Sequence, residues 1–441
     1  MIPIYTMEEA EKSILIRKPI VDVSVPPQMN KRIIELFGEF LTPLEAVRKI
    51  INDVIEKGDL ALIEWTKKLD NFDIDNSIEV KSELLESALE SIDKNVREAL
   101  ISAKDRIVAF HSKQPLSSWT TNELGGSLGQ IINPIQRVGF YIPGGSAPLP
   151  STVIHSVSPA IVAGVEEIVI ASPPPISSII LATCNIMRAL HGKIRVFQIG
   201  GAQAIAALAY GTESVPKVNK IIGPGNIFVT LAKREVFGIV GIDGIAGPTE
   251  AVIFADESAN PELIASDLLA QAEHDYLAIP IVITTSQDLA NKVKISIEEQ
   301  ILDLPRSKIA EHAIKNNGGI IVIPNTEKAI SVINNFAPEH LSIVIKNPKQ
   351  LLPLIKNSGG VFLGESSCEV LGDYIAGPSH VMPTGGAAKF SSPLSVLDFI
   401  KITSLISLDR KTVKSIAPLA EILACNEELQ AHSEAARRRA K

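Results

Sequence analysis

The sequence predicts an α/β fold: two Rossmann-like, doubly wound domains, a small N-terminal segment and a helical C-terminal arm. After about Val138, short runs rich in Val and Ile alternate with amphipathic stretches of helical length, which is typical of repeated βα units. Apolar residues are consecutive within these runs, which indicates strands buried on both faces of a largely parallel sheet. Two blocks of such units, at about 141–249 and 250–365, make duplication of one unit conceivable.

The elements follow in a clear order along the chain. From Asn30 to about Arg106 the pattern is helical, and Thr42-Pro43-Leu44-Glu45 combines an N-cap, a first-turn proline and a capping-box acid. From about Ser391 onward the chain is predicted to be helical up to a basic tail. The strands are predicted at 168–171, 196–199, 220–222, 251–254, 279–284, 320–323, 341–345 and 361–363, with helices between them.

Composition narrows the class of protein. The chain has 441 residues, and its 42 Lys and Arg against 50 Asp and Glu give a net charge of −8, too acidic to suggest a nucleic-acid partner. The three cysteines, Cys184, Cys368 and Cys425, are an odd and sparse set that favours a reducing compartment. The chain start lacks the pattern of a signal peptide, and no apolar run reaches about 18 residues. We therefore expect a cytoplasmic protein that acts on small molecules, without a membrane partner.

Three glycine-rich turns follow predicted strands, at 143–146 after Tyr141, at 200–203 and at 223–226. Glycines at such turns let phosphates approach the backbone, and the next helix N-terminus supplies free N–H groups. No Gly-x-Gly-x-x-Gly fingerprint is present, and tight turns alone would also require these glycines. The spacing leaves nucleotide binding and a purely structural role equally open.

Two polar pairs are candidates for chemistry. Gln271 and His274 are three residues apart on a predicted helix, so they share one face and could hold one ion, although a helix-terminal histidine is the plainer alternative. Glu339 and His340 lie just before a predicted buried strand. The entry edge of a sheet is a less common place for ligands than the exit edge, so this position argues only mildly for function.

Two further segments carry histidines. Residues 372–386, with Asp373 and His380, mix Gly and Pro with polar residues and lack both helical and strand periodicity. Long irregular segments of this kind are usually functional. His432 lies in the terminal helix, where a solvated face is the default interpretation.

Taken together, the motifs resemble the histidinol dehydrogenase family. The similarity includes Gln271-Ala-Glu-His274 and Ala337-Pro-Glu-His340 and runs over nearly the whole chain, more thinly before about residue 100 and at 290–330. The matching segments, in the order of the family, are 138–145, 200–211, 218–226, 243–250, 267–274, 337–340 and 372–386.

The resemblance implies a reaction and a set of site residues. L-Histidinol would be oxidised to L-histidine by two NAD molecules in succession, through a bound aldehyde, with one zinc ion per subunit. His340 would be the general base for the alcohol proton, and Glu339 would activate the water that adds to the aldehyde. The implied zinc ligands are Gln271, His274, Asp373 and His432.

Further contacts are also implied by the resemblance. Tyr141, Gln203 and Asn226 match positions that contact NAD, and they fall in or beside the three glycine-rich segments. The substrate would be held by the zinc ligands together with Thr249, His340, His380 and Glu427. A homodimer is expected in which the terminal helices cross over, so that Glu427 and His432 complete the partner's site.

The sequence pattern and the resemblance together predict four parts of the chain. They are an N-terminal arm at 1–29, one Rossmann-like domain at 30–140 and 250–395, an NAD-contacting Rossmann-like domain at 141–249, and a dimerisation arm at 396–441. Three positions depart from the family pattern: Thr249 stands for serine, Cys368 for proline and Val370 for a smaller residue. Alternative hypotheses are a related zinc and NAD dehydrogenase for another alcohol, or a binding module without catalysis, which the presence of Glu339 and His340 disfavours.

Overall fold

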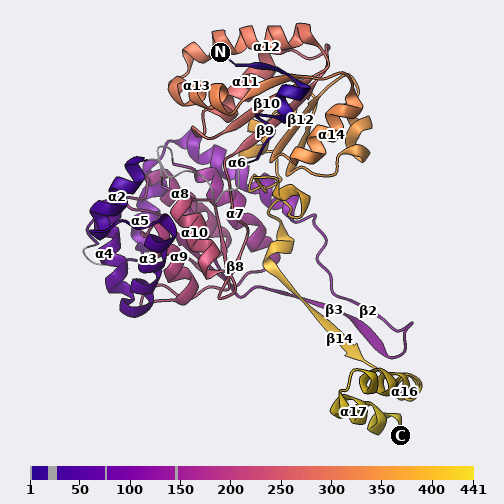
Figure 1. Ribbon diagram of the computed structural model, residues 1–441. Coiled ribbons are helices and arrows are strands. Elements are labelled where there is room, and N and C mark those ends of the chain that lie inside the picture. The colour runs from indigo at the N-terminus through magenta and orange to yellow at the C-terminus, as the bar shows by residue number, and fades with distance from the viewer. Residues whose placement is uncertain (1, 18–26, 75–76, 145–147) are drawn as a thin grey trace.

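The computed structural model describes residues 2–17, 27–74, 77–144 and 148–441. It is an α/β protein with a six-stranded sheet, a five-stranded sheet and a three-stranded sheet, as Figure 1 shows. The eight strands predicted from the sequence are all present, with bounds that differ by at most two residues. None of the helices in the described part of the chain combines the length and the apolarity needed to cross a bilayer.

The chain opens with one strand and a series of helices. The predicted capping box begins α3: the Thr42 side chain accepts from the Glu45 N–H at 3.3 Å, and the Glu45 carboxylate accepts from the Thr42 N–H at 2.8 Å. The elements are β1 (Ile4–Thr6), α1 (Met7–Glu11), α2 (Pro27–Phe37), α3 (Pro43–Lys57), α4 (Asp59–Asp70), α5 (Ser82–Ser91) and α6 (Lys94–His111).

The five-stranded sheet is parallel and has the strand order β6-β5-β4-β7-β8. Helices α7 and α8 share a core on one face, and α9 and α10 share a core on the other, so this sheet is doubly wound as predicted. Its elements are β4 (Arg137–Tyr141), α7 (Pro150–Ala163), β5 (Glu167–Ala171), α8 (Ser178–Leu190), β6 (Ile194–Phe197), α9 (Gly201–Tyr210), β7 (Lys220–Ile222), α10 (Ile227–Val236) and β8 (Gly241–Ile242).

The early helices pack on this same five-stranded sheet. Leu62 of α4 shares a core with Phe197 of β6, and Ile107 of α6 shares a core with Phe140 of β4. The predicted domain groups residues 30–140 with 250–395, whereas these helices share their cores with the sheet of residues 137–242. Their apolar faces pack against the sheet that follows them directly in the chain.

The six-stranded sheet is also parallel, in the order β1-β11-β10-β9-β12-β13. Helices α11 to α13 cover one face and α14 the other. Its elements, with the short helices that follow, are β9 (Glu250–Ala255), α11 (Pro261–Ala272), β10 (Ile279–Thr284), α12 (Gln287–Gln300), η2 (Ile301–Asp303), α13 (Ser307–Asn316), β11 (Gly319–Val322), α14 (Thr326–Phe336), β12 (His340–Val344), η3 (Pro348–Leu354), β13 (Gly360–Leu363), α15 (Glu369–Tyr374), η4 (Ala387–Lys389) and η5 (Val396–Phe399).

The start of the chain belongs to this sheet. Ile4 pairs with Ile320 and Thr6 with Val322, so β1 is the edge strand beside β11. Of the N-terminal arm predicted at 1–29, residues 4–6 form this edge strand. Backbone pairing fixes them to an element more than 300 residues away, which a local pattern does not reveal.

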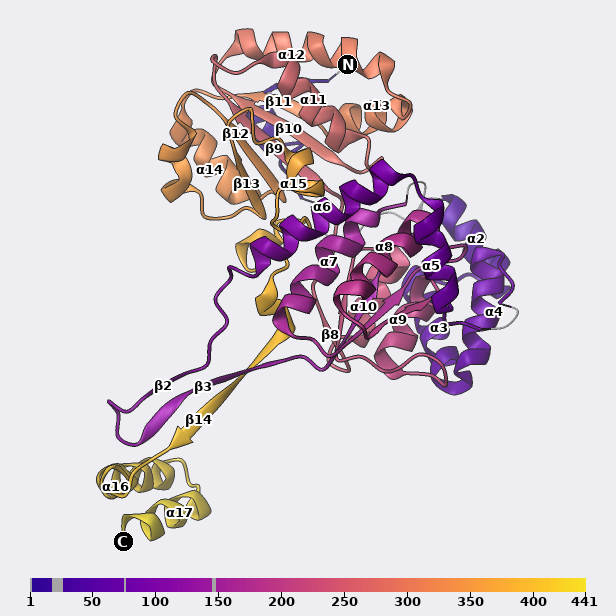
Figure 2. The same ribbon diagram turned by 180° about the vertical axis from the view of Figure 1, so that it is seen from behind.

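The third sheet is antiparallel and carries the C-terminal helices. β14 (Ile400–Ser407) pairs along its whole length with β3 (Ser127–Pro134), which also pairs with β2 (Trp119–Thr121). In Figures 1 and 2 this ribbon leads α16 (Arg410–Asn426) and α17 (Gln430–Ala440) away from the two larger bodies. The C-terminal arm is thus partly a strand, where an entirely helical one was predicted, because β14 depends on a partner far away in sequence.

Candidate active site

Glu339 and His340 lie at the entry of β12, which is the neighbour of the edge strand β13 in the six-stranded sheet. Ala337 ends α14 with a left-handed backbone (φ 53°), and this turns the chain into the strand. Both side chains are buried, with exposed fractions of 7% for Glu339 and 4% for His340. The site therefore occupies the amino edge of the sheet, at the point between β9 and β12 where the strand order reverses.

Thr249, just before β9, and Glu250, the first residue of β9, hold both groups. The Thr249 hydroxyl donates to Glu339 Oε2 at 2.7 Å, and the Glu250 N–H donates to the same oxygen at 3.0 Å. His340 Nδ1 lies 3.2 Å from the Glu250 carbonyl oxygen. Because a carbonyl only accepts, Nδ1 carries a proton, and Nε2 is the ring nitrogen whose proton can come and go.

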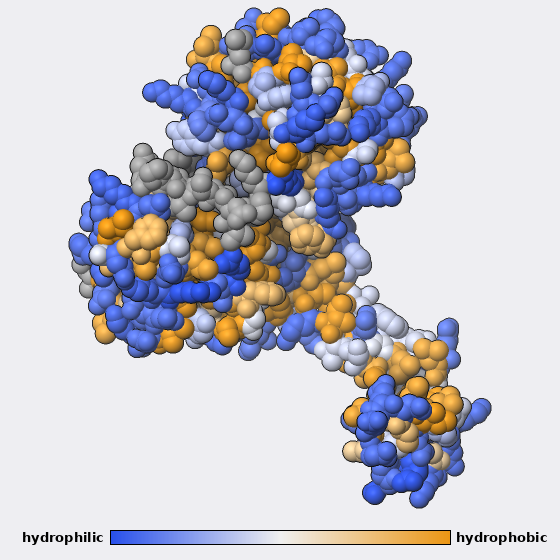
Figure 3. All heavy atoms as spheres, viewed as in Figure 1, coloured by the Kyte–Doolittle hydropathy of each residue, from blue (hydrophilic) through white to orange (hydrophobic). Residues whose placement is uncertain are grey.

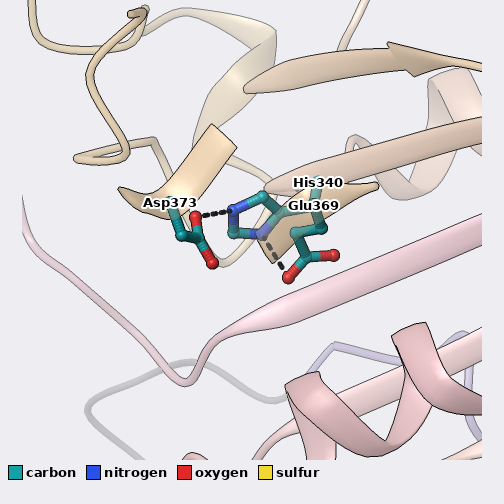
Figure 4. A group of neighbouring side chains, drawn as sticks. All are labelled: His340, Glu369 and Asp373. Carbon is teal, nitrogen blue, oxygen red and sulfur yellow. Dashed lines mark ion pairs between the residues drawn. The ribbon is translucent and has the colours of Figure 1, made fainter. Parts of the chain in front are cut away.

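Three carboxylates surround the His340 ring. Nδ1 lies 3.6 Å from Glu339 Oε2 and 3.7 Å from Glu369 Oε1, and Nε2 lies 3.5 Å from Asp373 Oδ1. Figure 4 shows Asp373 and Glu369 facing opposite nitrogens of the ring. Glu369 was not selected from the sequence, although its spacing of four residues from Asp373 places both on one face of α15.

The charges of this cluster are not balanced. Burial raises the pKa values of Glu339 and Glu369. Burial alone would lower the pKa of His340, but the carboxylates of Glu369, Glu339 and Asp373 outweigh it and raise that pKa. Burial also opposes ionisation of Asp373, yet its hydrogen bond with His340 and the charge of that ring lower its pKa. When all three carboxyl groups are ionised, one imidazolium among them leaves negative charge that a bound cation would offset.

Gln271 and His274, the predicted ion-binding pair, reach this cluster from the end of α11. The buried Gln271 amide contacts the Thr249 hydroxyl. With the amide oriented to satisfy both of its ends, it donates to Glu369 Oε1 at 2.5 Å and accepts from the Glu250 N–H at 3.3 Å. Desolvation lowers the pKa of His274, and the nearby Asp373 carboxylate acts in the opposite direction.

His380 extends the site toward the other sheet. Its Nδ1 donates to the Asp373 carbonyl at 2.8 Å, and its backbone N–H donates to His155 Nδ1 at 3.2 Å. The two rings stack, with centroids 4.2 Å apart and planes 10° from parallel. His155 lies on α7 and was not selected from the sequence, because only the fold brings α7 beside the irregular segment 372–386.

Glu427 and His432 are the candidates that one chain does not bring to the cluster. Both are exposed on the C-terminal arm, which Figures 1 and 2 show far from β12. The same arm exposes Leu419 and Leu423 of α16, with exposed fractions of 61% and 65%, and Figure 3 shows hydrophobic residues gathered there.

The donor set suits zinc. Of the implied zinc ligands, Asp373 offers an oxygen within 4.8 Å of ligand atoms of His340 and Glu369. The Gln271 amide contacts Glu369, and His274 is near enough to Asp373 to be affected by its charge. Carboxylate oxygen and imidazole nitrogen are ligands that Zn²⁺ accepts in proteins. A divalent cation would also relieve the negative excess described above.

Tyr141 and Gln203 lie at the exit edge of the five-stranded sheet. Tyr141 ends β4, and its hydroxyl accepts from the Gly201 N–H at 3.1 Å. Burial raises the pKa of Tyr141 to about 12, so its hydroxyl proton remains available at neutral pH. Gln203 on α9 is fully buried, and neither of its amide atoms has a hydrogen-bond partner in the described part of the chain. Such an orphaned buried amide is what a bound polar ligand would satisfy.

Asn226 and Gly223 follow β7, next to the point where the strand order of this sheet reverses. The Asn226 side chain caps α10 by accepting from the N–H groups of Phe228 and Val229. Gly223 has φ +124°, and a Cβ there would lie 2.1 Å from the Tyr141 carbonyl oxygen, so only glycine fits. Residues 145–147 of the first glycine-rich turn lie outside the described residues.

The three departures from the family pattern leave the local geometry intact. Thr249 keeps the hydroxyl that serine would offer and donates it to Glu339. Cys368 precedes α15 with φ −67°, a value that proline would also adopt. Val370 is 37% exposed, so its larger side chain meets solvent on that side.

Comparison with known proteins identifies the family of this chain. A family model described as histidinol dehydrogenase matches residues 40–440. The chain is 49% identical over 390 residues to the histidinol dehydrogenase of Aquifex aeolicus, covering 88% of this chain and 90% of that protein. It is 45% identical to that of Lactiplantibacillus plantarum, covering 92% and 95%.

A solved structure gives the same result at the level of the fold. The crystal structure of histidinol dehydrogenase from Elizabethkingia anophelis superposes with a TM-score of 0.89 at 34% identity, covering 99% of this chain and 98% of that one. The predicted α/β class and the predicted family resemblance are both confirmed. The chain belongs to the histidinol dehydrogenase family.

Proposed function

We propose that this histidinol dehydrogenase uses zinc and NAD to oxidise L-histidinol to L-histidine in two successive steps, through bound L-histidinaldehyde. The observation that carries the proposal is the buried Glu339 and His340 pair at the centre of Gln271, His274 and Asp373. Family membership supports the overall activity. The division of the reaction among residues rests on the chemistry of the site.

His340 is the base of the first step. Its Nδ1 is held by the Glu250 carbonyl, so Nε2, which lies 3.5 Å from Asp373 Oδ1, is the nitrogen that would accept the hydroxyl proton of the alcohol. The carbon that bears the hydroxyl loses a hydride, and the aldehyde results. Glu369, Glu339 and Asp373 together raise the pKa of His340, so a cation that offsets the charge of these carboxylates would lower that pKa and let Nε2 accept a proton near neutral pH.

Glu339 serves the second step. Water must add to the aldehyde carbon before another hydride can leave, and a carboxylate beside the substrate can take the proton of that water. Burial raises the pKa of Glu339, which makes its carboxylate a stronger base than an exposed one. Thr249 and the Glu250 N–H hold Oε2 of this carboxylate, which leaves Oε1 for the water.

Zinc would be held by Gln271, His274 and Asp373, with His432 of the partner subunit. When bound, it would supply positive charge that orients polar atoms of the substrate and polarises its oxygen. Thr249, His340 and His380 would contact the substrate from the chain that holds the cluster, and Glu427 from the partner. The orphaned amide of Gln203, with Tyr141 and Asn226, would bind NAD, which supplies the hydride acceptor.

Two features of the arm support a homodimer with shared sites. Its exposed apolar residues, such as Leu419 and Leu423, need a covering surface, and Glu427 and His432 lie too far from the cluster to act within one chain. A second copy would satisfy both needs. We also place the enzyme in the cytoplasm, since its three cysteines are unpaired and suit a reducing compartment.

The proposal is tested by turnover of L-histidinol with NAD before chelation, after chelation and after zinc is restored. We expect activity to disappear with the metal and to return with zinc. Activity that persists in metal-free protein would contradict the role of zinc. An amino alcohol without an imidazole ring that is oxidised faster than L-histidinol would instead favour a related dehydrogenase with another substrate.

A further inference from the structure

We propose that Arg17 is a positioning residue: together with Glu250 it forms an anchor that fixes the catalytic pair Glu339 and His340. The inference rests on the proposed function for the roles of that pair. The position of the anchor itself is argued from contacts between elements that are far apart in sequence. Neither Arg17 nor the Glu250 side chain was a candidate in the sequence analysis.

Arg17 reaches the site from the segment that follows α1. Its guanidinium forms a two-pronged ion pair with the Glu250 carboxylate, through Nη1 to Oε1 and through Nη2 to Oε2 at 2.8 Å. Nε and Nη2 also donate to the Phe336 carbonyl at 3.0 and 2.6 Å, and the guanidinium carbon lies 3.9 Å from the centre of the Phe336 ring. Arg17 therefore binds the end of α14, three residues before Glu339.

Glu250 connects this cation to both catalytic groups. Its N–H holds Glu339 Oε2, and its carbonyl accepts from His340 Nδ1. Its carboxylate, in a residue only 1% exposed, also accepts from the Gly385 N–H at 3.2 Å. Gly385 belongs to the irregular segment that carries Asp373 and His380. One residue thus touches the base, the carboxylate and the loop of the candidate metal site.

Only arginine can make this set of contacts. A planar guanidinium can bind both oxygens of a carboxylate, donate to a carbonyl and stack on a ring at once, whereas an ammonium group offers a single point charge. Without the cation, the buried Glu250 carboxylate would be left, among the described residues, with the Gly385 N–H as its partner, and the chain around it would rearrange. Small displacements of Glu339 and His340 would then slow the reaction strongly.

The test compares variants of the full-length enzyme. Arg17→Met removes the cation, and Arg17→Lys keeps the charge without the fork. The double variant Arg17→Met with Glu250→Gln removes both charges. The matched control is Lys328→Met, which breaks an exposed ion pair at 3.4 Å between Lys328 of α14 and Glu11 of α1. That ion pair links α14 to the helix just before Arg17 without reaching the site.

Two readouts are measured for each variant. Hydrogen exchange with mass spectrometry follows the amides of Glu250 and Gly385, and single-turnover kinetics follow the alcohol and aldehyde steps separately. For Arg17→Met we expect exchange of these amides to accelerate about ten-fold or more, and both steps to slow by about ten-fold or more by similar factors. Arg17→Lys should fall between Arg17→Met and the unmodified enzyme, and the control should match the latter.

The double variant separates positioning from stability. We expect its thermal stability to recover toward that of the unmodified enzyme, because no unpaired charge remains, while both steps stay slow because the fork is missing. Recovery of both steps together with stability would overturn the positioning role. So would unchanged exchange at Glu250 and Gly385 in Arg17→Met. If the unmodified enzyme itself fails to oxidise L-histidinol, the proposed function fails, and the exchange result alone decides whether the anchor exists.

Discussion

Lys233→Met tests the candidate NAD site at the exit edge of the five-stranded sheet. Lys233 on α10 is 3% exposed, and its Nζ donates to the Gly223 carbonyl at 2.8 Å and pairs with the Asp243 carboxylate. Asp243 in turn accepts from the Gly223 N–H at 2.8 Å. The lysine therefore clamps both backbone groups of the glycine turn that Tyr141 and Asn226 flank.

The expected loss can be estimated from these contacts. The two side chains of the pair are 4% and 13% exposed, so removal of the lysine leaves a largely buried carboxylate without its cation. Breaking a buried pair in this way costs about 3 kcal/mol or more of folding stability. A glycine turn that loses its clamp should also bind NAD at least about ten-fold more weakly, which corresponds to about 1.4 kcal/mol.

Urea unfolding and titration calorimetry with NAD measure the two effects, and metal analysis shows whether zinc is kept. Zinc content should not change, because Lys233 packs on the other sheet. Glu235→Gln is the matched control on the same helix, where an ion pair with the exposed Arg48 is broken, and it should leave NAD affinity unchanged. NAD affinity equal to that of the unmodified enzyme in a folded Lys233→Met protein would refute the placement of the NAD site at this turn.

Three further predictions concern the rest of the molecule. Burial raises the pKa of Asp70 from 3.8 to about 6 in the folded chain, so the stability that the protonated carboxyl gives at low pH is lost as pH rises through 6. Asp70→Asn should therefore stabilise the protein above pH 6 by about 1 to 2 kcal/mol, after allowance for solvent access, but not near pH 3. Urea unfolding at both pH values checks this. Glu339→Gln should slow aldehyde oxidation about 100-fold and alcohol oxidation much less, and equal loss in stopped-flow assays of the two steps would contradict their division. His432→Ala should weaken zinc binding in a metal competition assay, and zinc affinity equal to that of the unmodified dimer would contradict the shared site. Heterodimers of this variant with an Asp373→Ala chain should regain activity, because one of their two sites is intact.

Much of the fold could be predicted because its signals are local. Buried parallel strands have consecutive apolar residues, and the helix start at Thr42 has its capping box in adjacent positions. β1 and β14 could not be found in this way. Each exists by pairing with a strand distant in sequence, and each is short or exposed, so its own residues carry little periodicity.

The site residues also differ in whether a local sequence motif indicates them. Gln271, His274, Glu339, His340 and Asp373 were expected from their motifs, and the structure brings them together at one sheet edge. Glu369, His155 and Arg17 were missed, because their importance comes from neighbours in space. Arg17 illustrates the limit most clearly: nothing in its local sequence indicates that it meets Glu250, 233 residues away.

The most direct test of the central claim is the number of NADH molecules formed per molecule of L-histidinol consumed by the zinc-loaded enzyme. We expect two NADH for each L-histidine produced, with free aldehyde absent from the medium, because Glu339 and His340 act in succession on one bound substrate. One NADH for each L-histidinol, with aldehyde as the final product, would contradict the proposed role of Glu339 and the two-step reaction at this site.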